Sequence, residues 1–169
     1  MNMIKYEYLL DGSNKSTVLS DAITLDGVEF IKLSNVNDTP ETRKKLYELV
    51  KEGVIDDPGQ NGIFETFDQF SKKIFGHYWK NNKTQFLATY KGEWIGLCSI
   101  TIDKEKKVAK CGLTVVKKRY RGYGIASYLK NLSIDYCRSE GLLKMVTEVD
   151  ESNYPMMKIN QQNGFKRVT

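Results

Sequence analysis

Residues 119–126 combine the features of a binding site for a multiply charged anion. They read Arg-Tyr-Arg-Gly-Tyr-Gly-Ile-Ala and join an apolar run, 108–116, to a strongly amphipathic run that begins at Ile125. Gly122 and Gly124 allow a ligand to approach the backbone without meeting a Cβ atom. A turn from a strand into a helix directs several N–H groups, and the positive end of the helix dipole, at one point. Phosphate or pyrophosphate is the ligand that this chemistry favours.

The positive charge of the chain is concentrated around this turn. The 169 residues include 26 Lys and Arg against 21 Asp and Glu, a net charge of +5. Eight of the basic residues and one acidic residue fall within 104–121, and the remainder of the chain is slightly acidic. A local charge fits a small anion better than a polymer. Nucleic-acid binding is the weaker alternative, because aromatic residues are not interleaved with the lysines.

The spacing of glycines and cysteines excludes several other kinds of site. A Walker A loop requires Gly-x-x-x-x-Gly-Lys-Ser/Thr and a Rossmann fingerprint requires Gly-x-Gly-x-x-Gly, and the sequence contains neither. Cys98, Cys111 and Cys137 are widely spaced, and His77 is the single histidine. These residues form neither a CxxC pair nor a tetrahedral zinc set. We therefore expect neither a disulfide scaffold nor a metal.

The composition is that of one folded domain. Apolar residues make up 40% of the chain and aromatic residues 11%, which excludes intrinsic disorder. The apolar runs are far shorter than the ~20 residues that span a bilayer. The first residues have no signal-peptide pattern. The sequence therefore predicts a cytoplasmic protein that binds no membrane.

The glycine turn must be positioned by the elements around it. We expect residues 1–27 to form a hairpin-like extension from β-like runs at 4–10 and 17–25, and residues 28–169 to form a single domain. A strand is predicted at 28–33. Two helix starts follow, each marked by a cap residue and by a proline or a capping-box partner. They predict helices from Pro40 to Gly53, after Asp38 or Thr39, and over 67–77, after the Thr66–Gln69 box.

The second half of the chain predicts a mixed α/β fold, an antiparallel meander followed by a β-α-β unit with the glycine turn at its centre. In the central helix, Ile125 and Leu129 belong to the apolar face, whereas Lys130 is expected among the side chains that point away. The expected elements are strands at 84–90, 94–102 and 108–116, a helix from Ile125 to Gly141, a strand at 142–149 and a helix at 153–162.

Three groups of residues resemble a known family. Arg119-x-x-Gly122-x-Gly124 matches the Arg/Gln-x-x-Gly-x-Gly/Ala signature of the GNAT superfamily of acetyl-CoA-dependent N-acetyltransferases. Asn153 at a helix start and the Gly164-Phe165 pair that ends this helix extend the match, and so does the element order from Val28 onward. Further similarity, to a bacterial subgroup that acts on small molecules, rests on the 57–70 stretch and on a set of single residues: Thr114, Ala126, Leu129, Lys130, Asn153, Pro155, Met156 and Asn160.

The resemblance implies how acetyl-CoA would bind as co-substrate. Its pyrophosphate would lie on backbone N–H groups of the glycine turn, and its pantetheine arm would pair with the strand before the turn. The N–H of Val116 would polarise the thioester carbonyl. The implied cofactor-binding residues are Leu113, Thr114, Val116, Arg119, Arg121, Gly122, Tyr123, Gly124, Ile125, Ala126, Asn153 and Asn160.

The acid and the base of the reaction are less clearly marked. Family members place a tyrosine, the proton donor for the leaving thiolate, four residues before the Gly of Gly-Phe. Here that residue is Asn160, which cannot donate such a proton, so Tyr154, Tyr123 or water are the candidates. A lysine-like amine, with a pKa of ~10.4, is only about 0.04% neutral at pH 7, so a base is useful. Glu148, Asp150 or an ordered water are candidates for it.

The predicted function is transfer of the acetyl group of acetyl-CoA to a primary amine, most simply on a small molecule, by direct attack in a ternary complex. Two alternatives stay open. One is a catalytically silent domain that binds coenzyme A, suggested by Asn160 and by the short stretch after Gly164. The other is an acetyltransferase that acts on a protein amine. A homodimer is an expected way to complete the sheet.

Overall fold

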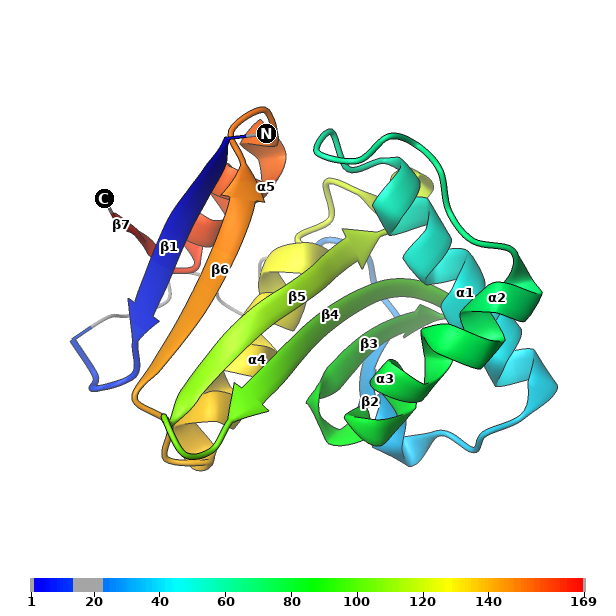
Figure 1. Cartoon of the computed structure of the whole chain (residues 1–169), viewed down its shortest axis with the longest axis horizontal. Helices are drawn as coiled ribbons and strands as arrows, with labels where there is room; N and C mark the ends of the chain where they lie inside the picture. Colours follow the sequence, from blue (N-terminus) through cyan, green and yellow to red (C-terminus); the bar gives the residue numbers. More distant parts are fainter. Residues whose placement is uncertain (1, 14–22, 169) are drawn as a thin grey trace.

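A single mixed sheet forms the centre of the computed structural model, which describes residues 2–13 and 23–168. Within these residues the strand order is β2-β3-β4-β5-β6-β1-β7. All neighbours are antiparallel except β5 and β6, which are parallel (Figure 1). This confirms the predicted mixed α/β class. The strands are β1 (Met3–Leu9), β2 (Val28–Lys32), β3 (Gln85–Tyr90), β4 (Glu93–Asp103), β5 (Val108–Val116), β6 (Lys144–Asp150) and β7 (Lys166–Val168).

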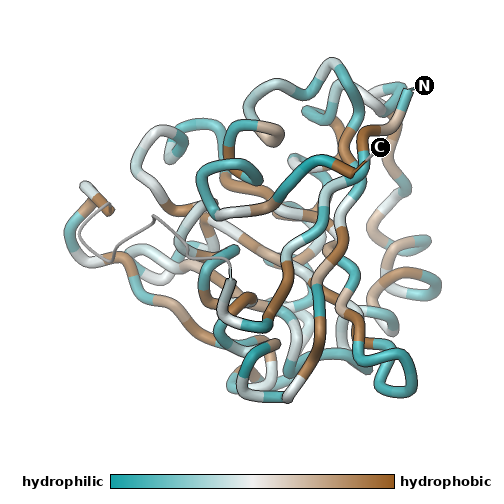
Figure 2. Tube along the Cα trace, turned by 90° about the vertical axis from the view of Figure 1, so that its left-hand side faces the viewer, coloured by the Kyte–Doolittle hydropathy of each residue, from teal (hydrophilic) through white to brown (hydrophobic). Residues whose placement is uncertain are grey.

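Helices cover both faces of the sheet, and each face has its own core. On one face α1 packs against β4 and β5, with α2 and α3 beside it, and on the other α4 packs against β3, β4 and β5. Figure 2 shows apolar segments running through the interior and hydrophilic ones at the outer turns. The helices are α1 (Pro40–Ile55), α2 (Phe67–Lys73), α3 (Phe75–Lys80), α4 (Ile125–Ser139) and α5 (Tyr154–Gln162), with 3₁₀ turns at Leu33–Asn35, Asn82–Thr84 and Lys118–Tyr120. None of the described helices is long and apolar enough to cross a bilayer.

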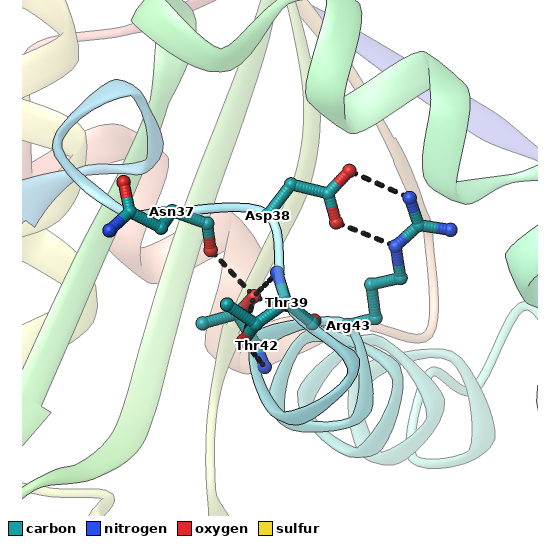
Figure 3. Close-up of polar contacts among 5 residues, drawn as sticks. All are labelled: Asn37, Asp38, Thr39, Thr42 and Arg43. Carbon is teal, nitrogen blue, oxygen red and sulfur yellow. Dashed lines mark hydrogen bonds and ion pairs between the residues drawn. The ribbon is translucent and has the colours of Figure 1, made fainter.

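The start of α1 is fixed by a network of side chains (Figure 3). Thr39 is the N-cap: its Oγ1 accepts from the N–H of Thr42, and its own N–H donates to Oγ1 of Thr42. Arg43 clamps the carboxylate of Asp38 with two hydrogen bonds of 2.6 Å. Of the two cap candidates in the sequence, the structure therefore selects Thr39, while Asp38 holds the helix from outside.

Two predicted helix ends differ from the structure. The first helix continues past Gly53 to Ile55. The reason is packing, because a Cβ atom on Gly53 would lie 2.7 Å from the Cβ of Val115 in β5. The second predicted helix, 67–77, is in fact two, α2 and α3, with a break at Ile74. The break allows both helices to bury aromatic rings beneath them.

The strand expected at 4–10 forms as β1, but its partners are distant in sequence. It pairs with β6 along its whole length and with β7 over three residue pairs. The run expected at 17–25 lies largely outside the described residues. The hairpin-like extension and the division of the chain at residue 27 therefore stay predictions.

The parallel strands β5 and β6 separate soon after they meet. Their pairing covers only Val108–Lys110 with Lys144–Val146, and beyond it the two strands diverge toward their C-terminal ends (Figure 1). On its other edge β5 is paired with β4, where the register shifts between Cys98 and Ile100. The result is a V-shaped opening within an otherwise continuous sheet.

Candidate active site

The opening between β5 and β6 contains a cavity of about 660 Å³. It extends from the glycine turn before α4, through the sheet, to the C-terminal end of α1. Because the strands are unpaired here, backbone groups as well as side chains are accessible from the cavity. Its lining includes residues 112–116 of β5, 147–150 of β6, 56–60 after α1 and Asn153 at the start of α5.

The glycine turn lies at one end of this cavity. Gly122 and Gly124 have φ values of +85° and +80°, which favour glycine because a Cβ atom is strained there. Gly124 is the N-cap of α4, and no described side chain caps this helix. The N–H groups of its first turn therefore remain available, and Gly122, Gly124, Ile125 and Ala126 all line the cavity. This is a built anion-binding geometry.

Glu93 anchors the turn from β4. Its carboxylate accepts hydrogen bonds from Nζ of Lys117 (2.9 Å), the hydroxyl of Tyr120 (2.9 Å) and Nη2 of Arg119. Partial burial raises the pKa of Glu93, but these three donors outweigh that effect and lower it to about 2. The carboxylate is therefore ionised throughout the physiological range, and the turn is held in one position.

Arg121 connects the turn to β5 and to α1. Its Nε donates to the carbonyl oxygen of Val116 (2.8 Å), and its Nη2 lies 2.6 Å from Oδ2 of Asp56. Arg121 lines the cavity, whereas Arg119 faces Glu93 and does not. The signature found at Arg119 is matched a second time, two residues later, by Arg121, Gly124 and Ala126, and all three of these line the cavity. The structure thus brings the second match, not the arginine of the first, to the cavity.

The edge of β5 that faces the opening is set by its pairing with β4. The N–H of Lys117 donates to the carbonyl of Ile95 on β4 (2.9 Å). Backbone groups alternate between the two edges of a strand, so those of Val116 and Thr114 point into the opening. Leu113 and Val116 also line the cavity, and the Leu113 side chain packs toward Gly53 of α1.

Four carboxylates also line the cavity. Glu148 and Asp150 come from β6, and Asp56 and Asp57 follow α1. Oε atoms of Glu148 lie 3.8 Å from the ammonium groups of both Lys5 and Lys110, and Asp56 is paired with Arg121.

Asn153 caps α5 and lies at the cavity. Its Oδ1 accepts from the N–H of Met156 (3.2 Å), so it caps α5, and its Nδ2 donates to Oδ1 of Asp57 (3.4 Å). It also lines the cavity. The cap thus links α5 to the segment after α1 across the opening.

Four of the residues singled out in the sequence lie away from the cavity lining. Arg119 turns to Glu93, Tyr123 and Tyr154 are exposed, the latter by 72%, and Asn160 is fully buried with neither amide atom hydrogen-bonded.

Among the lining residues to which the sequence assigned no role in the site are Gly112, Thr147 and Lys130. Gly112 and Thr147 follow the last paired residues of β5 and β6, and Lys130 projects from α4. Lys130 was expected to point away from the helix's apolar face, but only 1% of it is exposed. Its place beside Leu129 at the edge of the apolar face was the one available signal. No group of three His, Cys, Asp or Glu side chains that could hold a metal occurs in the described part of the chain.

Comparison with known proteins places this architecture in a family. Solved structures with the same fold include a GCN5-related N-acetyltransferase from Sphaerobacter thermophilus (TM-score 0.70, 18% identity, covering 98% of this chain and 48% of that one). Another is a GNAT-family acetyltransferase from Streptococcus pneumoniae (TM-score 0.62, 22% identity, covering 82% of this chain and 84% of that one). The model of the acetyltransferase (GNAT) family matches residues 47–165. The chain belongs to this family of acetyltransferase enzymes.

Two curated relatives are more specific by name. One is N-alpha-acetyltransferase 30 of Schizosaccharomyces pombe, 26% identical over 111 residues, which are 64% of this chain and 73% of that protein. The other is N-alpha-acetyltransferase MAK3 of Arabidopsis thaliana, 28% identical over 108 residues, 63% and 56% respectively. The chain thus matches little more than half of the Arabidopsis protein. Neither relative is named for a small-molecule substrate, which is the type that the sequence had suggested.

Proposed function

We propose that the protein transfers the acetyl group of acetyl-CoA to a primary amine by direct attack in a ternary complex. One observation carries the proposal: a single cavity joins the uncapped start of α4 to a carboxylate-lined rim through the opening between β5 and β6. The pyrophosphate would bind the N–H groups of Gly124, Ile125 and Ala126. The pantetheine arm would follow the free edge of β5 from Val116 back toward Gly112, and a backbone N–H of this edge would polarise the thioester carbonyl.

Direct attack is favoured because the thiols of the chain are poor nucleophiles. Cys98, Cys111 and Cys137 are all buried. Burial raises the pKa of Cys111 to about 11 and that of Cys137 to about 12, so both are protonated at neutral pH. An acetyl-cysteine intermediate is therefore disfavoured.

We propose a protein or peptide α-amine as the acceptor, in preference to the small-molecule amine. The pKa of an α-amine is ~7.7–8.0, so roughly 10–20% of it is neutral at pH 7, against about 0.04% of a lysine. Such an acceptor has little need of a strong base. This suits Glu148, whose charge is shared between Lys5 and Lys110. The names of both curated relatives also support this choice.

Calorimetric titration with acetyl-CoA tests the cofactor and its site. We expect micromolar binding by the wild type and its loss in Gly124→Glu, which places a carboxylate where the pyrophosphate would lie. Gly76→Glu is the matched control, because a Cβ at exposed Gly76 of α3 meets no atom within 4 Å. Absence of binding by the wild type would refute the proposal.

Release of free coenzyme A tests the acceptor. Peptides with a free α-amine are compared with the same peptides after N-terminal blocking, and with a panel of small diamines and amino sugars. We expect turnover with the free peptides only. Turnover confined to small amines would restore the small-molecule hypothesis, and binding without turnover would favour a silent coenzyme A-binding domain, the alternative suggested by Asn160.

A further inference from the structure

Lys130 of α4 is a buried cation at the deep end of the cavity. Its side chain is among the largest fully buried ones in the protein, with 1% of the residue exposed. It lines the cavity together with Gly112 of β5 and Thr147 of β6. These two residues lie just beyond the last paired positions, Lys110 and Val146. Lys130 therefore reaches from the helix to the point at which the two strands begin to separate.

The ammonium of Lys130 has no counter-ion in the part of the chain that the structure describes. Its recorded contact is the ring of Phe165, with Nζ 4.9 Å from the centroid. The carboxylates of β6, Glu148 and Asp150, alternate with Thr147 and so point to the other face of the sheet, where Glu148 lies near two other lysines. Burying an unpaired charge is costly. Negative charge that forms beside Lys130 would offset this cost.

The direction of the chain places a bound thioester near this cation. β5 runs toward the glycine turn, and α4 runs back from the turn along the same strand. With the pyrophosphate at Gly124, a pantetheine arm that follows β5 must extend from Val116 toward Gly112. Lys130 is six residues after Gly124, roughly 9 Å along α4 in the same direction. The sulfur of the cofactor is thus directed toward the deep end that Lys130 lines.

Phe165 contacts both Lys130 and the residue at which the family places a tyrosine. The residue at the family's tyrosine position is Asn160, whose backbone carbonyl accepts a hydrogen bond from the N–H of Phe165 (2.9 Å). The ammonium of Lys130 lies over the ring of Phe165. Asn160 itself is fully buried, and it is outside the cavity lining. Lys130, in contrast, lines the cavity and carries a proton that it can donate.

The same ammonium already acts on a thiol of the protein. Burial raises the pKa of Cys111, and the charge of Lys130 opposes that rise. A thiolate bound in the cavity that Lys130 lines would be stabilised by the same charge.

We propose that Lys130 stabilises and protonates the thiolate of coenzyme A when the acetyl group leaves; the inference rests on the proposed function. The amine nitrogen forms a bond to the thioester carbon, and the carbon–sulfur bond breaks with its electron pair on sulfur. A proton passes from Nζ to the sulfur and gives free coenzyme A. The acetylated nitrogen loses its extra proton to water, from which Nζ is reprotonated.

The first test measures the pKa of the bound coenzyme A thiol. The titration is monitored by the ultraviolet absorbance of the thiolate. A free thiol has a pKa of ~8.5. We expect wild-type protein to lower this value by at least about one unit, and Lys130→Met to return it to the free value or above. Lys106→Met removes the same positive charge from the exposed turn between β4 and β5, and in this variant the thiol pKa should stay below the free value. The other titratable groups around this site are the same in every variant: the thiols of Cys98, Cys111 and Cys137, the phenols of Tyr6 and Tyr8, and the ammonium of Lys158.

Turnover is the second test. We expect Lys130→Met to lower kcat by about 10²- to 10³-fold, with the KM for acetyl-CoA within about threefold of wild type. Lys130→Arg should keep the thiol pKa lowered but lose most of kcat, because a guanidinium does not release its proton at neutral pH. Thermal unfolding of each variant verifies folding, and Lys130→Gln is the substitute if Met at this position fails to fold.

The outcomes separate this proposal from the one that it rests on. A wild type that neither binds nor turns over acetyl-CoA refutes both. A wild type that turns over while its bound thiol titrates at or above the free value refutes the role of Lys130 alone. Unchanged kcat in Lys130→Met does the same.

Discussion

Single carboxylates hold the candidate site in place by binding donors from distant elements. The carboxylate of Glu93 in β4 accepts three hydrogen bonds from side chains at the start of the glycine turn. Glu52 of α1 accepts the backbone N–H of Lys118 (2.6 Å), and Asp56 pairs with Arg121. Because each contact joins residues far apart in sequence, the shape of the turn depends on the fold as a whole, and not on its glycines alone.

Glu93→Gln tests this anchoring. Loss of the charged acceptor should weaken acetyl-CoA binding about 5- to 10-fold and reduce the free energy of unfolding by about 1–2 kcal/mol. The folded-state pKa of Glu93 is lowered to about 2, so its contribution to stability is complete above the unfolded pKa of ~4.3 and is lost as the pH falls toward 2. Urea unfolding of both proteins should therefore give a difference that shrinks between pH 5 and pH 3. Glu105→Gln, in an exposed turn, is the control. An equal loss of affinity and of stability in this variant would contradict the anchoring role of Glu93.

The cysteines provide a second prediction at this scale. All three are buried, and the raised pKa values of Cys111 and Cys137 keep these thiols protonated well above pH 8. Native protein should therefore show no fast reaction with a disulfide reagent, and denatured protein should show three thiols. Inactivation of the native enzyme by alkylation would instead support a cysteine intermediate.

Much of the cavity lining was predictable from residue types, but not the direction of single side chains. The sequence predicted Gly122, Gly124, Val116 and Asn153, and these residues lie at the cavity. The two overlapping arginine matches could not be separated in sequence, because Glu93 and Asp56 decide which way each arginine turns. Lys130 was missed for a related reason: helical periodicity alone does not determine which side chains at the border of an apolar face become buried.

At the scale of elements, the contact of α1 with β5 depends on the absence of a side chain. A Cβ atom on Gly53 would lie 2.7 Å from Cβ of Val115, so Gly53→Ala should force α1 away and cost about 1–3 kcal/mol. Gly76→Ala, in α3 with no atom within 4 Å of a new Cβ, is the control and should be neutral or stabilising. Equal denaturant midpoints for the two variants would contradict this account.

The elements themselves were largely predictable where local signals agree. β5 has the predicted bounds, and the capping box of Thr66 and Gln69 forms as expected. The break at Ile74 and the extension of α1 past Gly53 were not predictable, because each is decided by packing against another element. Gly53 illustrates the difficulty: a glycine near a helix end indicates a stop, but here it permits close packing.

At the scale of the whole molecule, β1 is a buried part of the sheet. Tyr8 is fully buried, with its ring 5.4 Å from that of Phe165. Tyr8→Ala should lower the free energy of unfolding by about 3–5 kcal/mol. Tyr154→Ala, at a position 72% exposed, should change it by less than about 0.5 kcal/mol. Chemical unfolding of both variants measures the difference, and a small effect at Tyr8 would show that β1 is dispensable.

The position of β1 between β6 and β7 also has a kinetic consequence. The ion pair of Glu7 with Lys144 joins residues 137 positions apart, and the whole ladder from β1 to β6 closes a comparably large loop. Contacts between residues so far apart in sequence form late, and they reduce the folding rate. During synthesis β1 cannot pair until almost the entire domain has emerged from the ribosome. Its apolar side chains stay exposed until then. We therefore expect the nascent chain to need chaperone protection at its N-terminal segment until β6 and β7 are available.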